Sequence, residues 1–373
     1  MALFVRSAGG VRAVSAASIA RASLLLCAVV ACDIPTGVPT WNQTWVVPGD
    51  STQVSVSELL PKSGEVTVVT AGSTKVFSLA VPAPPAISTS LGQVCPVCVS
   101  ANGTTVSKPA FTLRDSTSTT LPSDLVSAAI TSGSLAYTIT NGFSFDPLRP
   151  NAAGAPYGYL VVRVMNGTTV VASDSVDGQT TAMGKNGATF QRTLAFNAVT
   201  VSGASPLRVV ITLDSPQGDA ITINTSESFS LAAQPGQVTL GQATVKVQSQ
   251  SIAGQQTSID LSSVDASAVV NRVQGGALRL TVANPFGVQG QLDAVITAAG
   301  MAPITKTIVL SSSATSTPRV DLTADELRAM LGKSVTLTVG GVVSSPSGTV
   351  TLDPTQVLKV KSDFELTIST TEG

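Results

Sequence analysis

Residues 132–143 have the sequence SGSLAYTITNGF, in which apolar and polar side chains alternate up to an Asn that is followed two positions later by a Phe. Such alternation is typical of a β-strand with one buried face. Residues 275–286, GGALRLTVANPF, repeat the pattern 143 positions later. The aligned pairs are Leu135 with Leu278, Ile139 with Val282, Asn141 with Asn284 and Phe143 with Phe286. The chain is therefore predicted to use one β unit twice.

A second pair of segments supports this repeat. Ser215-Pro216-Gln217-Gly218 and Ser345-Pro346-Ser347-Gly348 each lie between two strand-like runs, 130 positions apart. The change of offset requires an insertion or deletion between the repeats, and chance similarity among Val- and Thr-rich strands is the alternative. We place the first repeat at residues 121–233 and the second at residues 238–369.

Short strands separated by turns predict an all-β fold of tandem β-sandwiches, immunoglobulin- or fibronectin-like, with one or two short helices. Asn166-Gly167 predicts a type I′ hairpin turn. A capping box from Thr323 to Glu326 predicts a helix that ends near Gly332, and a further helical turn is expected within residues 264–273. Phe143, Phe145 and Phe286 are expected in the core rather than on a ligand surface.

The strand end Leu280-Thr281-Val282-Ala283-Asn284-Pro285-Phe286 resembles the Asn-Pro strand end of the late-embryogenesis-abundant type 2 (water-stress) domains. Those domains are seven-stranded sandwiches, so the resemblance implies a sandwich here. It covers this strand end alone, and the first repeat has Gly142 where the Pro would be.

Residues 45–120 are predicted to form a separate small β domain. Strand-like runs lie at residues 53–57, 66–69 and 75–81, and prolines at 82, 84 and 85 interrupt pairing. The polar run 116–120 would bridge to the first repeat. Trp41 and Trp45 could lie at a membrane interface; the favoured interpretation is that they cover the edge of this first domain.

The N-terminus has the features of an export signal. Arg6, Arg12 and Arg21 precede an apolar run at residues 22–31 that is too short to span a bilayer. Val29-Val30-Ala31-Cys32 ends this run and resembles the lipobox of bacterial lipoproteins. The resemblance implies a signal peptide at residues 1–31, removal of it before Cys32, and a diacylglyceryl group on the Cys32 thiol. An ordinary signal peptide with a chance cysteine is the alternative.

A lipidated Cys32 would make residues 32–44 a lipid-anchored linker in the bacterial cell envelope. One acyl chain gives marginal membrane binding, at about 0.8 kcal/mol per buried methylene, whereas two or more palmitate-like chains hold firmly. The expected partner is thus the membrane, through the lipid. In some bacteria an Asp directly after the lipidated cysteine, as at Asp33 here, keeps a lipoprotein in the inner membrane. That rule does not hold in every bacterium, so the membrane leaflet is not predicted.

Composition limits the chemistry that the chain can perform. Histidine is absent, which excludes Ser-His-Asp and Cys-His nucleophilic sites and His metal ligands. Carboxylate chemistry, a Ser–Lys pair, and calcium at turn carboxylates such as Asp174, Asp177, Asp214 and Asp219 remain open. A net charge of −1 suggests no basic surface for nucleic acid. We therefore predict no cofactor, no metal and no nucleic-acid partner.

Two cysteines remain once Cys27 leaves with the signal and Cys32 carries the lipid. Cys95 and Cys98 are predicted to form a local disulfide in an oxidising envelope. A redox-active dithiol is the alternative, and it would lie between a strand and the start of a helix. The flanking residues 90–94 and 99–105 indicate a strand and a turn instead.

Together these features predict a non-catalytic cell-envelope lipoprotein with a structural or adhesive role. The alternative is a binding module for an apolar or glycan ligand near the membrane. The protein or glycan partner is not identified by the sequence.

Overall fold

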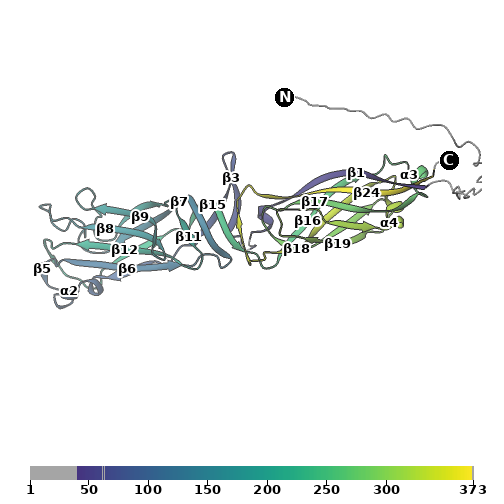
Figure 1. The fold of residues 1–373 in the computed structure, drawn as a ribbon. Helices are drawn as coiled ribbons and strands as arrows, with labels where there is room; N and C mark the ends of the chain where they lie inside the picture. Colours follow the sequence, from purple (N-terminus) through teal and green to yellow (C-terminus); the bar gives the residue numbers. More distant parts are fainter. Residues whose placement is uncertain (1–39, 61, 63, 372–373) are drawn as a thin grey trace, which may run out of the picture.

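The fold is all-β, as predicted, with antiparallel sheets and a few short helices. The computed structural model describes residues 40–60, 62 and 64–371, so Cys32 and the predicted signal lie outside the described residues. The described chain forms a long rod of two β-sandwiches joined end to end (Figure 1). We call them sandwich 1, which contains β7, and sandwich 2, which contains β17.

Sandwich 1 consists of two antiparallel sheets. One has four strands in the order β6, β12, β8, β9, which span Phe111–Thr119, Leu207–Ser215, Tyr159–Asn166 and Thr169–Asp177. The other is built around β7, Leu125–Asn141. Its second half pairs with β14 on one side and β10 on the other, and β4 pairs with β14. These strands, with β11, are Ser228–Ala233, Ala188–Ala195, Ile87–Ser90 and Thr200–Ser202.

Sandwich 2 has the same strand order. Its four-stranded sheet runs β16, β22, β18, β19, which span Gln250–Asp260, Ser334–Ser344, Gln289–Ala298 and Ile304–Leu310. The facing sheet has β17, Val273–Ala283, between β24 on one side and β20 and β21 on the other, with β1 beyond β24. The bounds of these partners are Thr40–Ser55 for β1, Thr315–Ser316 for β20, Arg319–Leu322 for β21 and Val357–Thr371 for β24.

The two sandwiches are therefore topological copies. The strands β6, β7, β8 and β9 of sandwich 1 correspond to β16, β17, β18 and β19 of sandwich 2. The aligned segments SGSLAYTITNGF and GGALRLTVANPF form and follow β7 and β17, and the two Ser-Pro segments follow β12 and β22. The offset between the two repeats changes because the connection from β7 to β8 is longer than the equivalent connection from β17 to β18.

The predicted small domain at residues 45–120 is not a separate unit. β1 is the edge strand of sandwich 2, and its residue Thr40 pairs with Thr371. β6 contains the polar run expected to be a bridge and pairs with β12 in sandwich 1. Sandwich 1 is thus inserted between the first and second strands of sandwich 2, which no local pattern reveals.

At the junction, the sheet of sandwich 1 that contains β7 is extended by β2, β3, β15 and β23. β15, Gly236–Lys246, pairs with the first half of β7, with β3 and with β23. β2, β3 and β23 span Val66–Ala71, Thr74–Val81 and Thr349–Leu352. Among the described strands, the chain passes between sandwich 2 and this sheet at four places: from β1 to β2, β15 to β16, β22 to β23 and β23 to β24. Val56, Leu59 and Leu60, in and after the short helix η1 (Val56–Glu58), are buried here.

Both predicted helical segments are present. α4, Ala324–Met330, begins with the capping box of Thr323 and Glu326, and Gly332 after it has φ +72°. α3, Ala266–Val269, is capped by Asp265. The hairpin after β8 differs in register: Asn166 pairs with Thr169, and Gly167, with φ +59°, is the first central residue, as in type II′ rather than type I′ turns.

The Asn166 side chain explains this shift. It is buried, its Nδ2 donates to the carbonyls of Ser202 and Ser205, and its Oδ1 accepts from the Ser202 amide at 2.7 Å. Asn166 is therefore held as the last residue of β8, and the turn falls one position later.

Candidate functional sites at the two ends of the rod

The two ends of the rod differ in character. The chain enters the described structure at the end of sandwich 2, where β1 begins beside the end of β24 (Figure 1). The opposite end, which we call the tip, carries the short helix α2, Pro96–Ser100, and the two-stranded ribbon of β5, Thr105–Ser107, and β13, Ala220–Thr222. The predicted lipid site, eight positions before Thr40, thus precedes the end that is farthest from the tip.

The tip loops are organised by buried and half-buried polar side chains. Asn141 is fully buried; its Nδ2 donates to the carbonyls of Phe145 and Gly184, and its Oδ1 accepts from the Phe143 amide. Asp146 accepts four backbone amides at 2.8–3.2 Å, from Leu148, Arg149, Met183 and Gly184. These contacts tie the loop after β7 to the loop before β10.

A hollow of about 430 Å³ lies between these loops. Its lining includes two cationic side chains, Arg149 and Lys185, and two carboxylates, Asp146 and Asp219. Asp219 accepts the Ala152 amide at 2.7 Å, and Arg149 donates to the carbonyls of Gly178 and Gln179. Both carboxylates are thus occupied by backbone donors, while Lys185 is exposed to solvent.

Lys108 lies under the tip, only 1% exposed. Its ammonium donates to the Pro216 carbonyl and lies 4.8 and 5.3 Å from the ring centroids of Phe111 and Phe145. Burial lowers the Lys108 pKa from 10.5 to about 7, and the nearby Asp214 opposes this. No local pattern in the sequence indicates this buried lysine. The expected core positions of Phe143, Phe145 and Phe286 are confirmed.

Cys95 and Cys98 are joined as a disulfide, with their sulfurs 1.94 Å apart and their Cα atoms 5.2 Å apart. The expected strand and turn around them are wrong. α1, Leu91–Val94, starts with a capping box at Ser90 and Gln93, and α2, Pro96–Ser100, starts with a proline that suits a first helical turn. Both cysteines are 1% exposed. Because thiol exchange requires access to sulfur, this burial favours a structural role.

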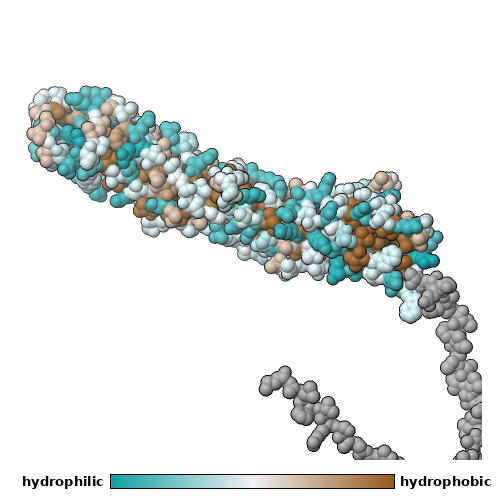
Figure 2. Space-filling view, turned by 90° about the horizontal axis from the view of Figure 1, so that it is seen from above, coloured by the Kyte–Doolittle hydropathy of each residue, from teal (hydrophilic) through white to brown (hydrophobic). Residues whose placement is uncertain are grey.

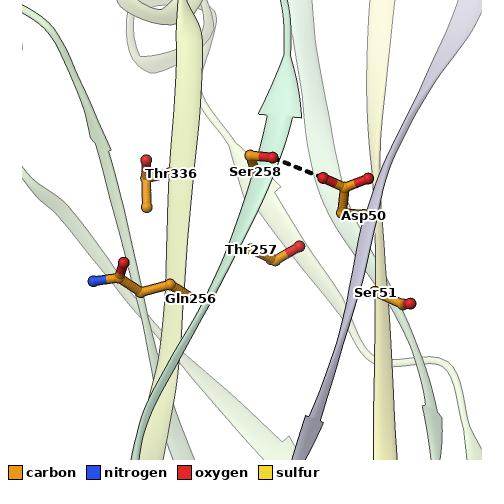
Figure 3. A pocket seen from close by; sticks show the side chains of 6 residues that line it. All are labelled: Asp50, Ser51, Gln256, Thr257, Ser258 and Thr336. Atoms are coloured by element: carbon orange, nitrogen blue, oxygen red, sulfur yellow. Dashed lines mark hydrogen bonds between the residues drawn. The ribbon is translucent and has the colours of Figure 1, made fainter.

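A second hollow, of about 510 Å³, lies on sandwich 2 where the edge strands β1 and β16 meet (Figure 3). A register shift between Pro48 and Ser51 brings Asp50 to Ser258, whose hydroxyl donates to the carboxylate at 2.7 Å. Thr257 beside them has a buried hydroxyl without a partner among the described residues. This bulge closes the edge of the sandwich. The polar lining of the hollow includes one carboxylate and no cationic side chain.

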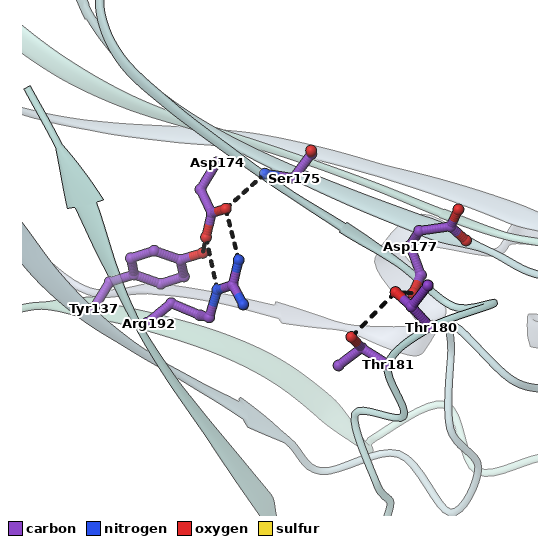
Figure 4. A network of polar contacts seen from close by, with 7 residues as sticks. All are labelled: Tyr137, Asp174, Ser175, Asp177, Thr180, Thr181 and Arg192. Atoms are coloured by element: carbon purple, nitrogen blue, oxygen red, sulfur yellow. Dashed lines mark hydrogen bonds and ion pairs between the residues drawn. The ribbon is translucent and has the colours of Figure 1, made fainter. Parts of the chain in front are cut away.

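A polar network links the two sheets of sandwich 1 (Figure 4). The Tyr137 hydroxyl donates to Asp174 at 2.8 Å, and Arg192 donates to both oxygens of the same carboxylate. The Arg192 guanidinium lowers the Asp174 pKa, whereas burial and the bond to Asp174 raise the Tyr137 pKa. The lowered pKa keeps Asp174 ionised near neutral pH, where it holds the Tyr137 and Arg192 side chains in place.

The other carboxylates considered for calcium are also used locally. Asp177 accepts the Gln179 amide, and Asp214 accepts the Thr112 hydroxyl. Within the described residues, no three His, Cys, Asp or Glu side chains group as a metal site. Nor does any described helix have the length and apolar character needed to cross a membrane.

Comparison with known proteins adds little. No family model and no curated protein matches the chain. Among solved structures, it is similar to a putative secreted protein from Parabacteroides distasonis, with TM-score 0.27 and 11% identity over 89% of this chain and 100% of that one. It is also similar to a tandem CBM22 domain of Paenibacillus barcinonensis Xyn10C, with TM-score 0.16 and 9% identity over 87% and 99% of the two chains. At these TM-scores the similarities assign neither a family nor a function.

Proposed function

We propose that the protein is a non-catalytic lipoprotein of the bacterial cell envelope, tethered by lipid at Cys32, with a structural or adhesive role. The observation that carries this proposal is the pairing of β1 with β24, which puts the entry of the chain at one end of the rod and the loop-rich tip at the other. A tether before β1 then holds the tip away from the membrane.

The joined build of the rod suits such a spacer. Two sandwiches connected by a flexible linker can move relative to each other, but here the extended sheet of sandwich 1 and four chain passages connect them. β15 alone pairs with β7, β3 and β23. The tip would therefore keep its distance from the tether.

Metabolic labelling with a palmitate probe tests the tether. Label on the native chain and none on Cys32→Ala is expected, together with loss of the variant from the membrane fraction. Cys27→Ala is the matched control, because that cysteine lies within the predicted signal. Equal labelling of the native chain and Cys32→Ala, or label on neither, would contradict the proposal.

A binding module for a glycan is the second candidate function, and the tip hollow favours it. Lys185 and Arg149 offer cationic groups there, and Tyr157 and Tyr159, which are 38% and 47% exposed, lie in and after the loop that carries Arg149. An acidic sugar would suit this combination of charge and exposed ring. Binding of a glucuronate oligomer that Lys185→Ala weakens, and Lys75→Ala in β3 does not, would support it; equal binding by both variants would refute it.

A further inference from the structure

We propose that Trp41 and Trp45 insert into the interfacial region of the membrane that holds the Cys32 lipid, and seat the end of sandwich 2 on that membrane. The inference rests on the proposed tether and adds a protein surface to it. The partner is a phospholipid bilayer, met at the level of its headgroups.

The geometry of β1 places both indoles on one side of the strand. Trp41 pairs with Thr370 and Trp45 with Leu366, so they lie four positions apart on the same face. β1 is an edge strand, with β24 as its ladder partner. Although Leu366 on that face is buried, Trp41 is 58% and Trp45 43% exposed.

This exposure is unusual for the composition of the chain. Aromatic residues make up 4% of the sequence, and its two tryptophans are these two. Val46, on the opposite face of β1, is also 56% exposed. An exposed edge strand with large apolar side chains normally invites aggregation, which argues for a partner that covers it. Figure 2 shows that apolar residues also gather on the surface at this end of the rod.

The position of the surface favours a membrane over other partners. Thr40 lies eight positions after Cys32, and a chain of that length spans at most about 29 Å. A lipid on Cys32 would hence keep β1 within that distance of the bilayer surface. Tryptophan is the side chain that most favours the interface, because its apolar ring and its N–H donor suit the headgroup level. The Trp45 Nε1 bonds the exposed Gln43 side chain, a contact that lipid headgroups can replace.

Intrinsic fluorescence tests the inference directly, because all tryptophan emission of the chain comes from this surface. The mature lipidated protein would be reconstituted into phosphatidylethanolamine–phosphatidylglycerol vesicles, with or without lipids brominated near the headgroup end of the acyl chains. We expect at least a twofold quenching by the brominated lipids and a blue shift relative to the unlipidated Cys32→Ser protein.

A moved probe provides the control. In Trp41→Phe/Trp45→Phe/Tyr157→Trp the fluorophore is at the tip, and its emission should be unquenched. If the native protein floats with the vesicles but its tryptophans are not quenched, the insertion of Trp41 and Trp45 is overturned and the lipid tether is not. Protein that does not float would overturn both. A blue shift that depends on protein concentration without vesicles would assign the surface to a second copy of the chain and also overturn the seat.

Discussion

Sandwich 1 and sandwich 2 share a strand order but complete the same strand end differently. Asn141 and Asn284 are both buried, and each donates its Nδ2 to the carbonyl four residues later and to a carbonyl in a more distant loop. The Asn141 Oδ1 accepts the Phe143 amide, whereas the Asn284 Oδ1 has no partner in the described residues. The shared donor pattern is therefore the part that the fold requires.

The following residue explains why the two strand ends differ in sequence. Gly142 donates its amide to the Ser228 carbonyl in β14, and a Cβ at Gly142 would lie 2.5 Å from that oxygen. In sandwich 2 the pairing of β17 with β24 ends at Ala283, so Pro285, which has no N–H, interrupts no ladder. In sandwich 1 the pairing continues past the Asn, and the close approach of β14 requires glycine at position 142. In sandwich 2 the pairing ends before the Asn, so a proline is tolerated at position 285.

The buried charges differ as well. Sandwich 2 buries Glu365 between Arg279 and Arg319, at 3.1 and 2.8 Å. Sandwich 1 buries Lys108 against two phenyl rings and a backbone carbonyl, without an ion pair within 4.0 Å among the described residues. A charge without a counter-ion is costly to bury, so sandwich 1 should respond to pH where sandwich 2 does not.

The largest expected effect comes from Lys108. Its pKa is about 7 when folded and 10.5 otherwise, so between these values the unfolded chain holds a proton that the native chain has lost. The free energy of unfolding of sandwich 1 should therefore rise between about pH 7 and pH 10.5, by up to about 5 kcal/mol. Attraction between the Lys108 ammonium and the two phenyl rings stabilises the charged form and makes the rise smaller. Lys108→Met should abolish the rise and stabilise the protein below pH 7.

Urea denaturation at pH 6 and pH 9.5 measures this effect. Lys185→Met is the matched control, since that lysine is exposed. Parallel changes of stability with pH in Lys108→Met and the native chain would show that Lys108 does not cause the difference between the sandwiches.

Exchange of the residues after the two asparagines should have the next largest effect. Gly142→Pro removes an amide donor and puts ring atoms against the Ser228 carbonyl, so we expect a loss of about 3 kcal/mol or more. Pro285→Gly should cost less than about 1 kcal/mol, chiefly by freeing the unfolded chain. Thermal unfolding of the two variants compares them, and similar losses would mean that the ladder beyond Asn141 is not what requires glycine.

Removal of each asparagine should give the smallest contrast. Asn141→Ala removes the partner of three backbone groups and Asn284→Ala that of two, so at about 1 kcal/mol each we expect losses of up to about 3 and about 2 kcal/mol. Chemical denaturation resolves this difference. A larger loss for Asn284→Ala would show that the unpartnered Oδ1 finds a bond in solution.

Local signals in the sequence were sufficient for much of the fold. Alternation along β7 and β17 and the capping box of α4 depend on neighbouring residues, and each produced the expected element. The glycine after β8 produced the expected hairpin, although with a different turn type. The partner of β1 could not be predicted, because β24 lies more than 300 residues away and many strands here alternate in the same way. The four- and five-residue helices around Cys95 are too short for periodicity to indicate.

The sites were less predictable than the fold. Lys108 precedes Pro109 like an ordinary loop lysine, and its burial depends on Phe111, Phe145 and Pro216, which come together only in the folded chain. The tip hollow likewise joins loops 142–152, 184–185 and 219–221. Cys95 and Cys98 could be paired because they are close in sequence, where few alternatives exist.

The insertion of sandwich 1 after β1 also determines how the molecule would bear tension. If the chain is held before Thr40 and pulled at the tip, the force runs along the backbone of β1 and passes to β2, without crossing the rest of sandwich 2. The 16 residues of β1 are already extended, at about 3.3 Å each, so they have little length left to release. Sandwich 2 would then hold the loaded strand through its pairing with β24, without itself lying in the path of the force. The rod would lengthen less under tension than two domains joined one after the other by a linker.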